Sequence, residues 1–476
     1  MDLDKDLAAR QEARALVRAA KAAQHLLADF TQDQLDAIVE AMARAFAAEA
    51  AMLAELAVKE TGFGNLEDKI TKNLFAAREV AKAVRDQKCV GLLREIPEKK
   101  LWEIGIPVGV IAAIVPSTNP TSTVCYKALI ALKSGNPIVF SPHPKAAECT
   151  RKAAWILSEA ATRAGAPRGS IGCLSIPSLA GCQELMAAKE TRLILATGGP
   201  AMVKAAYSSG KPAIGVGAGN GPAYIHHSAD VEQALRCILE SKTFDNGTVC
   251  ASEQSIIVET AMEEPVRTKA RQLGFYYMEK EEAARLAKLL FRPNGTLNPD
   301  IVGKTAIYLA EKAGFSVPKD TKILVAREQE AGPSVPYSME KLCPVLAFYV
   351  MENEEAVLNK CIEILDHEGS GHTFSMHCGD ETVIRRFAEK IPVSRFLVNT
   401  PAALGGIGAS TGLFPALTLG CGAVGGSSSS NNISPMDLIN IRRVAWGKQT
   451  PHRPEQNHEL VDLLTRKIME KLEGKL

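Results

Sequence analysis

The sequence is poor in aromatic residues, which make up 5% of its 476 positions, and its charges show no excess of one sign. The 55 lysines and arginines balance the 54 aspartates and glutamates, so the net charge gives no reason to expect a nucleic acid or an anionic membrane surface as partner. Apolar residues still amount to 46%, enough for a large core. We therefore expect small-molecule or protein partners and, from the length, two or three domains.

Long apolar runs are missing too. The longest, PVGVIAAIVP (107–116), has about ten residues, half of the roughly twenty needed to span a bilayer. The first residues carry acids and no unbroken apolar stretch, which is not the pattern of a signal peptide. Eleven scattered cysteines include no Cys-x-x-Cys pair, so we expect neither a disulfide framework nor a zinc ribbon, and a reducing, cytoplasmic setting.

The pattern of apolar residues predicts an α/β protein. Residues 6–90 show helical spacing, with Thr31 and Gln34 forming a capping-box signal. From residue 101 short β-type runs alternate with helical segments, which indicates a parallel sheet covered by helices. A second α/β region extends to about residue 420, with KTAIYLA (304–310) expected as a strand leading into a helix.

The last residues divide into a polar linker and an amphipathic helix. The linker, KQTPHRPEQN (448–457), contains proline and little apolar surface. The helix that follows places one apolar stripe along its length, formed by Leu460, Val461, Leu464, Ile468 and Leu472. This segment resembles the encapsulation peptides of bacterial microcompartment enzymes, which implies contact with a shell through residues 458–476. Packing as an extra helix on the enzyme or its oligomer is the alternative.

Two glycine-rich segments are candidates for a dinucleotide site. GVGAGNGP (215–222) does not match G-x-G-x-x-G and leads into a strand, so it fails the context that the fingerprint requires. LILATGGP (193–200) ends a strand at the start of a helix, whose free N–H groups could hold a pyrophosphate. A tight structural turn would need the same glycines, and the local pattern leaves both interpretations open.

Histidine and cysteine suggest two further sites. His367, His372 and His377 recur every five residues, a spacing that suits neither a helix face nor a strand face. We interpret them as loop histidines rather than metal ligands, and we expect no metal site. Cys250 lies in a loop of small and polar residues before a β-branched run, where a thiol is either a nucleophile or simply buried.

Nearly the whole chain, from about residue 6 to 446, resembles the aldehyde dehydrogenase superfamily, and most of all its CoA-acylating branch of the acetaldehyde and propionaldehyde type. Five segments carry the resemblance, in the family's order and spacing: PSTNPTSTV, ALKSGNPIVFSPHP, ILATGGPAMVKAAYSSGKPAIGVGAGNGPAYI, SKTFDNGTVCASEQSIIVE and EKLCPVLAFY. The resemblance implies a doubly wound, Rossmann-like cofactor domain, an α/β catalytic domain and a small oligomerisation element.

The resemblance also assigns roles to single residues. Cys250 matches the catalytic cysteine, and Asn119 matches the asparagine that stabilises the oxyanion together with the Cys250 backbone N–H. Glu340 matches the glutamate that holds the nicotinamide ribose; taken alone, Asn119 could be a turn residue and Glu340 a surface acid. The other positions that the resemblance places at the cofactor are Ser141, Pro142, His143, Thr197, Gly198, Gly199, Val216 and Gly217.

Two departures from the hydrolytic branch bear on the expected acyl acceptor and on the expected cofactor. Val216 stands where that branch has a glutamate that activates water, which implies that a cysteine-bound acyl group passes to coenzyme A. Ser141 and His143 replace the lysine and glutamate of the hydrolytic branch, so NAD is expected with NADP still open. The alternatives are a hydrolytic aldehyde dehydrogenase, an acylating enzyme for succinic semialdehyde or sulfoacetaldehyde, and a non-catalytic scaffold. No arginine cluster stands out near the motifs, which favours an uncharged aldehyde.

The resemblance also predicts the domain limits. The NAD-binding domain is expected at 1–90 and 108–220, and the catalytic domain at 221–430. Residues 91–107 and 431–446 are expected to form the oligomerisation element of a homodimer or homotetramer, followed by the linker and helix of 447–476.

Overall fold

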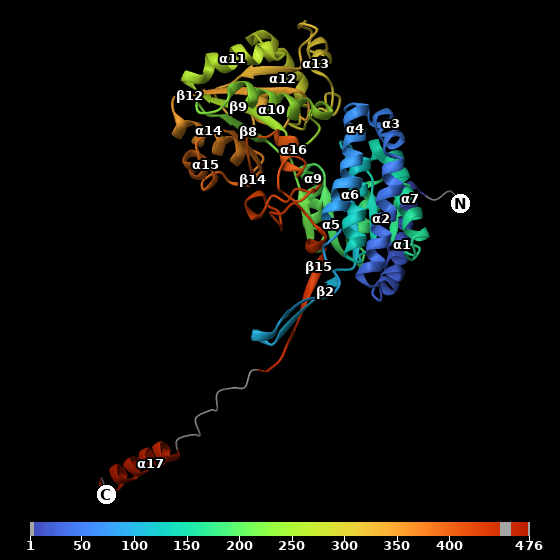
Figure 1. The fold of residues 1–476 in the computed structure, drawn as a ribbon, viewed down its shortest axis with the longest axis vertical. Helices are drawn as coiled ribbons and strands as arrows, with labels where there is room; N and C mark the ends of the chain where they lie inside the picture. The colour runs from blue at the N-terminus through green and yellow to red at the C-terminus, as the bar shows by residue number, and fades with distance from the viewer. Residues whose placement is uncertain (1–3, 448–457, 475–476) are drawn as a thin grey trace.

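The computed structural model describes residues 4–447 and 458–474, which form three β-sheets and the helices around them (Figure 1). Two of the sheets are parallel and covered by helices, which confirms the predicted α/β fold class. The third sheet is antiparallel. Within the described ranges no helix is long and apolar enough to cross a membrane.

The first helices form one side of the molecule (Figure 1). They are α1 (Lys5–Leu27), α2 (Gln32–Ala48), α3 (Ala50–Thr61), α4 (Leu66–Leu74) and α5 (Val80–Val84), with a π-helical turn at Phe75–Glu79. The predicted capping box at the start of α2 is present: Gln34 N donates to Thr31 Oγ1, and Thr31 N donates to Gln34 Oε1. Alanine-rich faces let α1 and α2 pack closely against the helices that cover the first parallel sheet.

The first parallel sheet has five strands in the order β5-β4-β3-β6-β7. The strands are β3 (Val110–Ile114), β4 (Ile138–Ser141), β5 (Ile171–Cys173), β6 (Thr191–Thr197) and β7 (Ala213–Val216). The helices between them are α6 (Pro120–Lys133), α7 (Ala147–Arg163), α8 (Leu179–Ala187) and α9 (Pro200–Tyr207). Because β3 is central and buried at every position, the middle of the apolar run of 107–116 is a core strand.

The second parallel sheet has seven strands in the order β10-β11-β12-β9-β8-β13-β14. The strands are β8 (Gly221–Ile225), β9 (Glu253–Glu259), β10 (Phe275–Tyr277), β11 (Ile323–Arg327), β12 (Val345–Met351), β13 (Gly371–His377) and β14 (Val393–Val398). The helices are α10 (Val231–Thr243), α11 (Glu263–Gln272), α12 (Lys280–Leu290), α13 (Ala306–Lys312), α14 (Glu354–His367), α15 (Glu381–Ala388) and α16 (Ala402–Gly406). Short 3-10 turns occupy 97–99, 144–146, 244–247, 260–262, 336–338, 423–425 and 435–438.

Two expectations about local structure are wrong. The segment 304–310 holds no strand: Thr305 caps α13 by accepting from Tyr308 N, so the apolar residues there follow a helical face. None of the three histidines lies in a loop: His367 is the last residue of α14, and His372 and His377 are buried on β13, an inner strand of the seven-stranded sheet. The domain limits stay a prediction; the first parallel sheet ends at Val216 and the second begins at Gly221.

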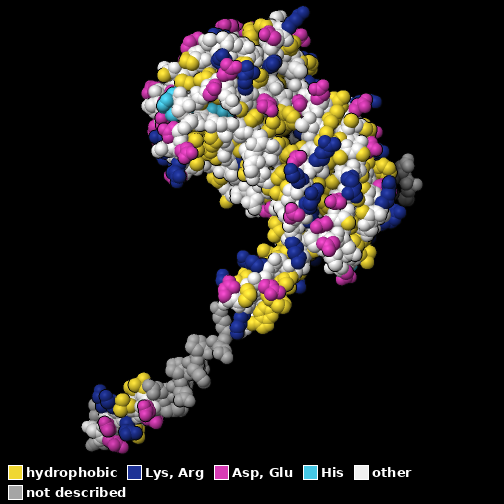
Figure 2. All heavy atoms as spheres, viewed as in Figure 1, with side chains coloured by type: hydrophobic (Ala, Val, Ile, Leu, Met, Phe, Trp, Pro, Cys, Tyr) yellow, Lys and Arg dark blue, Asp and Glu magenta, His cyan; other side chains and the backbone are white. Residues whose placement is uncertain are grey.

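The antiparallel sheet forms an arm that extends away from the two parallel sheets (Figure 1). Its strands are β1 (Gly91–Ile96), β2 (Leu101–Pro107) and β15 (Ile439–Ala445), in the order β1-β2-β15. Large apolar side chains are exposed on the sheet or directly after it: Leu92, Trp102, Ile441 and Trp446. Figure 2 shows hydrophobic atoms along the arm. An exposed apolar sheet of this kind is typical of a surface that another subunit covers.

Helix α17 (His458–Glu473) lies apart from the rest of the chain in Figure 1. Every side chain of residues 459–474 is exposed, including the five of the predicted apolar stripe. The predicted amphipathic helix is therefore present with its apolar face uncovered. The predicted linker, residues 448–457, lies outside the described residues.

Candidate active site

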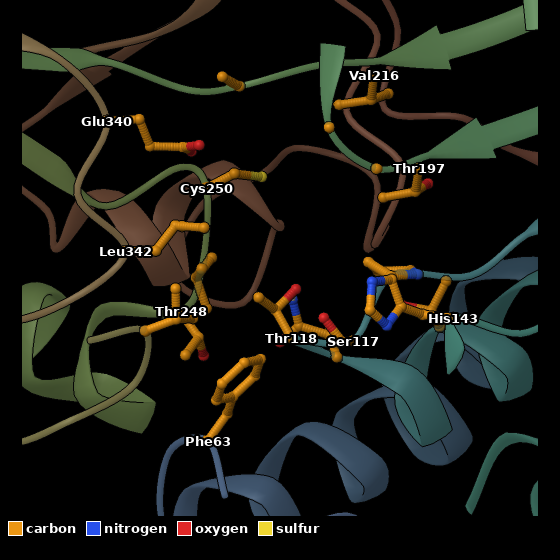
Figure 3. Close-up of a pocket in the computed structure, with 18 of the residues that line it drawn as sticks. Phe63, Ser117, Thr118, His143, Thr197, Val216, Thr248, Cys250, Glu340 and Leu342 are labelled. Carbon is orange, nitrogen blue, oxygen red and sulfur yellow. The ribbon is translucent and has the colours of Figure 1, made fainter. Parts of the chain in front are cut away.

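A cavity of about 530 Å³ lies between the two parallel sheets (Figure 3). One wall comes from loops that follow the carboxyl ends of β3, β4, β6 and β7. The other wall comes from segments that precede β9 and β12, at the amino ends of the second sheet. Loops at the carboxyl ends of an open parallel sheet are where α/β proteins bind nucleotides. The sheets thus bring a cofactor-type edge and a loop containing Cys250 to one cavity.

Cys250 lies three residues before β9 begins at Glu253, and this inner strand of the seven-stranded sheet anchors its backbone. Its side chain points into the cavity (Figure 3). Of the eleven cysteines, only Cys250 and Cys173 are not fully buried. Burial, and next the Glu340 carboxyl, raise the pKa of the Cys250 thiol to about 12. The thiol is therefore protonated at neutral pH in this state, and its ionisation has to accompany the reaction.

Asn119 lies on the opposite wall, at the residue before α6. It occupies the N-cap position, but its side chain makes no capping hydrogen bond. Pro120, at the first position of the helix, has no N–H to be satisfied there. The Asn119 amide is instead held by Lys72, whose Nζ donates to Asn119 Oδ1, while Asn119 Nδ2 donates to Thr118 Oγ1 at 3.1 Å. These contacts make Asn119 more than a turn residue.

A buried cluster of charges stands behind Asn119, and the sequence motifs did not reveal it. Lys69 and Lys72, one turn apart on α4, both donate to Asp245 Oδ2. All three side chains are buried. Burial disfavours a charged carboxylate, but the two ammonium groups more than offset it and hold the pKa of Asp245 below its usual value. No local pattern could reveal the cluster, because Asp245 lies 173 residues from Lys72.

Glu340 is a cavity residue rather than a solvated surface acid. Its Oε1 accepts a hydrogen bond from Gly219 N at 2.8 Å, and its own N–H donates to Glu368 Oε2 at 2.7 Å. Figure 3 shows its carboxyl group beside Cys250. Burial, and next the nearby Glu368 charge, raise the pKa of Glu340 to about 8. Glu340 is therefore largely protonated at neutral pH in this state.

The two glycine segments have different roles. At the end of β6, Thr197, Gly198 and Gly199 line the cavity just before Pro200 begins α9. The second segment, in the turn between β7 and β8, brings backbone close to the nucleophile: a Cβ on Gly219 would lie 2.0 Å from the Cys250 carbonyl oxygen. A side chain is excluded there, which explains the glycine without any phosphate.

The β6–α9 turn fits a dinucleotide phosphate. Thr197 Oγ1 is buried without a hydrogen-bond partner among the described residues, although it borders the cavity. A Cβ built on Gly199 would meet no atom within 4 Å, so the approach to the helix N-terminus is open. Free N–H groups, an orphaned hydroxyl and open space are what an anionic phosphate requires.

The remaining predicted cofactor residues divide into two groups. Val216, Gly217 and His143 line the cavity, with His143 Nδ1 accepting from Lys145 N at 3.1 Å. Ser141 and Pro142, at the end of β4, are buried and do not line it. Their contact with an adenosine ribose stays a prediction.

His372 and Arg395 are two further buried groups near Cys250. A Cβ on Gly219 would lie 3.2 Å from His372 Cε1 as well as against the Cys250 carbonyl, so the histidine and the nucleophile share this neighbour. Burial, and next the Arg395 charge, lower the pKa of His372 to about 3, which keeps its ring neutral. Its Nε2 has no hydrogen-bond partner among the described residues. The five-residue spacing of the histidines did not predict this position, because the burial of His372 results from the packing of β13 inside the sheet.

The described residues contain one group with the geometry of a metal site, formed by His226, His227 and Glu354. It lies after β8, beyond the carboxyl ends of the second sheet and away from the cavity. Each member already has a partner: His226 Nε2 contacts Glu354, and Arg386 donates to the same carboxylate. His227 Nδ1 contacts Glu259.

The fold and this cavity define an aldehyde dehydrogenase, and the comparison of sequences agrees. The profile of the aldehyde dehydrogenase family matches residues 4–273, more than half of the chain, and the chain belongs to this family. It is 46% identical over 439 residues to the bifunctional aldehyde-alcohol dehydrogenase AdhE of Escherichia coli K12, covering 91% of this chain and 49% of that protein. The chain thus spans about half the length of the curated relatives it matches first.

Solved structures give the same result over nearly the whole chain. An acetylating aldehyde dehydrogenase from Geobacillus thermoglucosidasius is 50% identical with a TM-score of 0.92, covering 94% of this chain and all of that one. A propionaldehyde dehydrogenase from Rhodopseudomonas palustris, solved with bound CoA and an acylated cysteine, is 27% identical with a TM-score of 0.83. That match covers 91% of this chain and 97% of the other. The predicted resemblance to the acylating branch is confirmed.

Proposed function

We propose that this protein oxidises a short-chain aldehyde to its acyl-CoA, with NAD⁺ as hydride acceptor and Cys250 as the nucleophile. The observation that carries the proposal is the meeting of Cys250 and Asn119 in one cavity whose lining contains a single carboxyl group, Glu340. The bound CoA and acylated cysteine of the Rhodopseudomonas palustris enzyme support the same chemistry.

The chain's own residues provide the acyl transfer. The Cys250 sulfur, once deprotonated, adds to the aldehyde carbon and forms a tetrahedral thiohemiacetal. The Asn119 amide and the Cys250 backbone N–H stabilise the alkoxide oxygen, and removing one such donor typically lowers the rate by about 10²–10³. When bound along the β6–α9 turn, the nicotinamide dinucleotide supplies the ring that accepts the hydride. The Cys250 thioester then remains, and the CoA thiol displaces the cysteine sulfur.

Water is a poor acceptor in this site because no base stands ready for it. Val216 lines the cavity where the hydrolytic branch has its glutamate. The one lining carboxyl, Glu340, has its pKa raised to about 8 and one oxygen engaged by Gly219 N. A thiol nucleophile needs less activation than water, since an ordinary thiol, with a pKa of about 8.5, is already a few per cent thiolate at neutral pH. These features favour transfer to CoA over hydrolysis.

The walls near Cys250 favour a small uncharged aldehyde. Apolar side chains make up part of the cavity lining: Phe63, Val249, Ile407, Leu417 and Leu419. One arginine, Arg292, also lines the cavity, but its side chain is exposed at the rim. The buried cation of the lining, Lys72, already donates to Asn119, Asp245 and Thr248, so its three N–H groups are engaged within the protein. We therefore propose acetaldehyde or propionaldehyde as substrate rather than succinic semialdehyde or sulfoacetaldehyde, whose anionic end would need a buried cation of its own.

We propose NAD rather than NADP because the basic side chains that could meet a 2′-phosphate at the edge of the first sheet, His143 and Lys145, are both exposed. A 2′-phosphate bound there would stay largely solvated and gain little. The ratio of kcat/KM for NAD⁺ and NADP⁺ tests this choice directly, and a preference for NADP⁺ contradicts it.

We also propose that the arm formed by β1, β2 and β15 joins subunits of a homodimer or homotetramer.

For residues 458–476 we propose contact with a microcompartment shell, because α17 presents an exposed apolar stripe with charged residues on its other side. The alternative is packing of the same stripe on another subunit. Residues 448–476 can be removed to separate the two: loss of co-purification with shells supports docking, whereas loss of the oligomer supports packing.

The central experiment measures NADH formation from acetaldehyde or propionaldehyde with and without CoA, and identifies acyl-CoA by mass spectrometry. We expect turnover that depends on CoA and that falls by about 10³-fold or more in Cys250→Ala. The matched control is Cys173→Ala, which removes the other incompletely buried thiol, a residue outside the cavity lining. Rapid CoA-independent turnover would instead identify a hydrolytic enzyme, and wild-type rates in Cys250→Ala would refute the nucleophile.

A further inference from the structure

We propose that Lys72 is the positioning residue of this site: it fixes the Asn119 amide with its nitrogen toward the cavity and joins the two walls that form the oxyanion site. The inference rests on the proposed function, because that function gives Asn119 its oxyanion-binding role. Lys72 itself lines the cavity. Its role is assigned from contacts among residues that lie far apart in the sequence.

The first step is the orientation of an amide. An ammonium group can only donate hydrogen bonds, so Lys72 Nζ has to face the oxygen of the Asn119 amide, Oδ1. The amide nitrogen then lies on the other side with two hydrogens. Thr118 Oγ1 accepts one of them at 3.1 Å, which leaves the second for a ligand in the cavity. In the reverse orientation an amide oxygen would face the alkoxide and repel it.

The second step is the connection between the two walls. Asn119 follows β3 of the first parallel sheet, whereas the Cys250 N–H belongs to the loop before β9 of the second. Lys72 Nζ donates not only to Asn119 but also to Asp245 and, at 3.2 Å, to Thr248 Oγ1, both in the loop that leads to Cys250. A single buried ammonium group therefore contacts both halves of the oxyanion site. Such a contact sets the separation of the two donors.

The loop that Lys72 holds is strained and closely clamped. Asp245 and Asn246 are consecutive non-glycine residues with φ of 48° and 53°, a backbone conformation that costs free energy and persists only where contacts enforce it. Asn65 N donates to Asp245 Oδ1 at 2.9 Å, and a Cβ on Gly64 would lie 1.7 Å from the same oxygen. The turn between α3 and α4 thus holds Asp245 on one side while Lys72 holds it on the other.

The charges of the cluster allow a clean substitution. Lys69 and Lys72 share one fully buried counterion, Asp245, while the Asp68 carboxylate, which accepts from Asp245 N, is only partly buried. Replacing Lys72 by methionine, which has a similar volume, leaves a neutral pair of Lys69 and Asp245 with no uncompensated buried charge. Burial lowers the pKa of Lys72 to about 8, with Asp245 opposing the shift, so the side chain is charged at neutral pH. The variant is therefore expected to fold.

Lys69→Met is the matched control. It removes the same charge from the same helix and from the same Asp245, but Lys69 Nζ contacts the Thr118 carbonyl rather than the Asn119 amide. We expect Lys72→Met to lower kcat by about 10²-fold, the loss typical of one oxyanion donor, with KM for the aldehyde and Kd for NAD⁺ changed less than threefold. Lys69→Met should change kcat by less than tenfold. Equal losses of kcat in both variants overturn the inference.

The dependence on Asn119 is tested by combining substitutions. If Lys72 acts through Asn119, then Lys72→Met should lower kcat much less in an Asn119→Ala background than in the wild type, because the group it positions is already gone. Full additivity of the two losses means that Lys72 acts independently of Asn119 and overturns the inference. The rate of Cys250 alkylation by iodoacetamide should stay unchanged in Lys72→Met, which a general disruption of the site would alter.

A crystal structure of Lys72→Met tests the positioning of Asn119 independently of the reaction that the enzyme performs. We expect the Asn119 side chain to rotate away from its wild-type orientation or to occupy two orientations, whatever reaction the enzyme performs. An unchanged Asn119 amide overturns the positioning role even if the enzyme makes acyl-CoA. If wild-type protein makes no acyl-CoA but the amide rotates, the proposed function fails and the positioning role stands.

Discussion

We expect the cofactor-free protein to lose thermal stability as the pH rises from about 5 to 8, and we expect Glu340→Gln to lose less of it over the same range. The cavity raises the pKa of Glu340 to about 8, from an ordinary value of 4.5. Between these two values the folded protein keeps a proton on Glu340 that the unfolded chain has released. The folded state therefore binds more protons, and the free energy of unfolding falls with increasing pH.

The size of the effect follows from the width of this window. Inside it, one extra bound proton lowers the free energy of unfolding by about 1.4 kcal/mol for each pH unit. For a domain of 150–250 residues, 1 kcal/mol corresponds to about 2–4 °C in Tm. Glu340 should thus account for a fall of about 3–6 °C per pH unit. Glutamine can still accept the hydrogen bond from Gly219 N, so the substitution removes the titration and preserves the contact.

The assay is Tm against pH, from 5 to 9, for the wild type and Glu340→Gln without cofactor. Other buried groups titrate as well: burial lowers the pKa of His372 to about 3 and of His377 to about 4, and raises the pKa of Glu253 to about 7. Their contributions cancel in the difference between the two curves. Parallel curves would refute the reasoning. Glu368→Gln is a useful second variant, because loss of the Glu368 charge should lower the folded-state pKa of Glu340 and so narrow the window from its upper end.

Three further predictions concern the site and the last helix. The rate of Cys250 alkylation by iodoacetamide in the cofactor-free protein should keep rising to pH 10, since its pKa is raised to about 12; a plateau below pH 9 contradicts this. Val216→Glu should increase CoA-independent NADH formation by tenfold or more by supplying a base for water, whereas Val216→Gln, with no base, should not. Removal of residues 448–476 should leave kcat within about twofold and Tm within about 2 °C, because residues 459–474 are all exposed; a large loss of either shows that the helix packs on the enzyme.

The sequence alone gave the order of helices and strands over most of the chain, because local patterns carry that information. The Thr31 capping box, the buried run that became β3 and the strand before the β6–α9 turn all follow from residue spacing. The error at 304–310 has a local cause: a short apolar run reads as either strand or helix, and the Thr305 cap decided for the helix. Cys250, Asn119 and Glu340 needed five motifs together, since each alone has an ordinary structural explanation.

Other features were decided only by the tertiary structure. The contacts of Lys72 with Asn119 and Asp245 span 47 and 173 residues, and no periodicity relates positions so far apart. Gly219 needs to be glycine because the Cys250 backbone passes beside it. The raised pKa of Glu340 and the neutral state of His372 follow from burial, which the packing of two sheets sets. The sequence determined which groups this protein has for its chemistry, and the fold determined their separation and their charge, because distance and desolvation exist only once the sheets have packed.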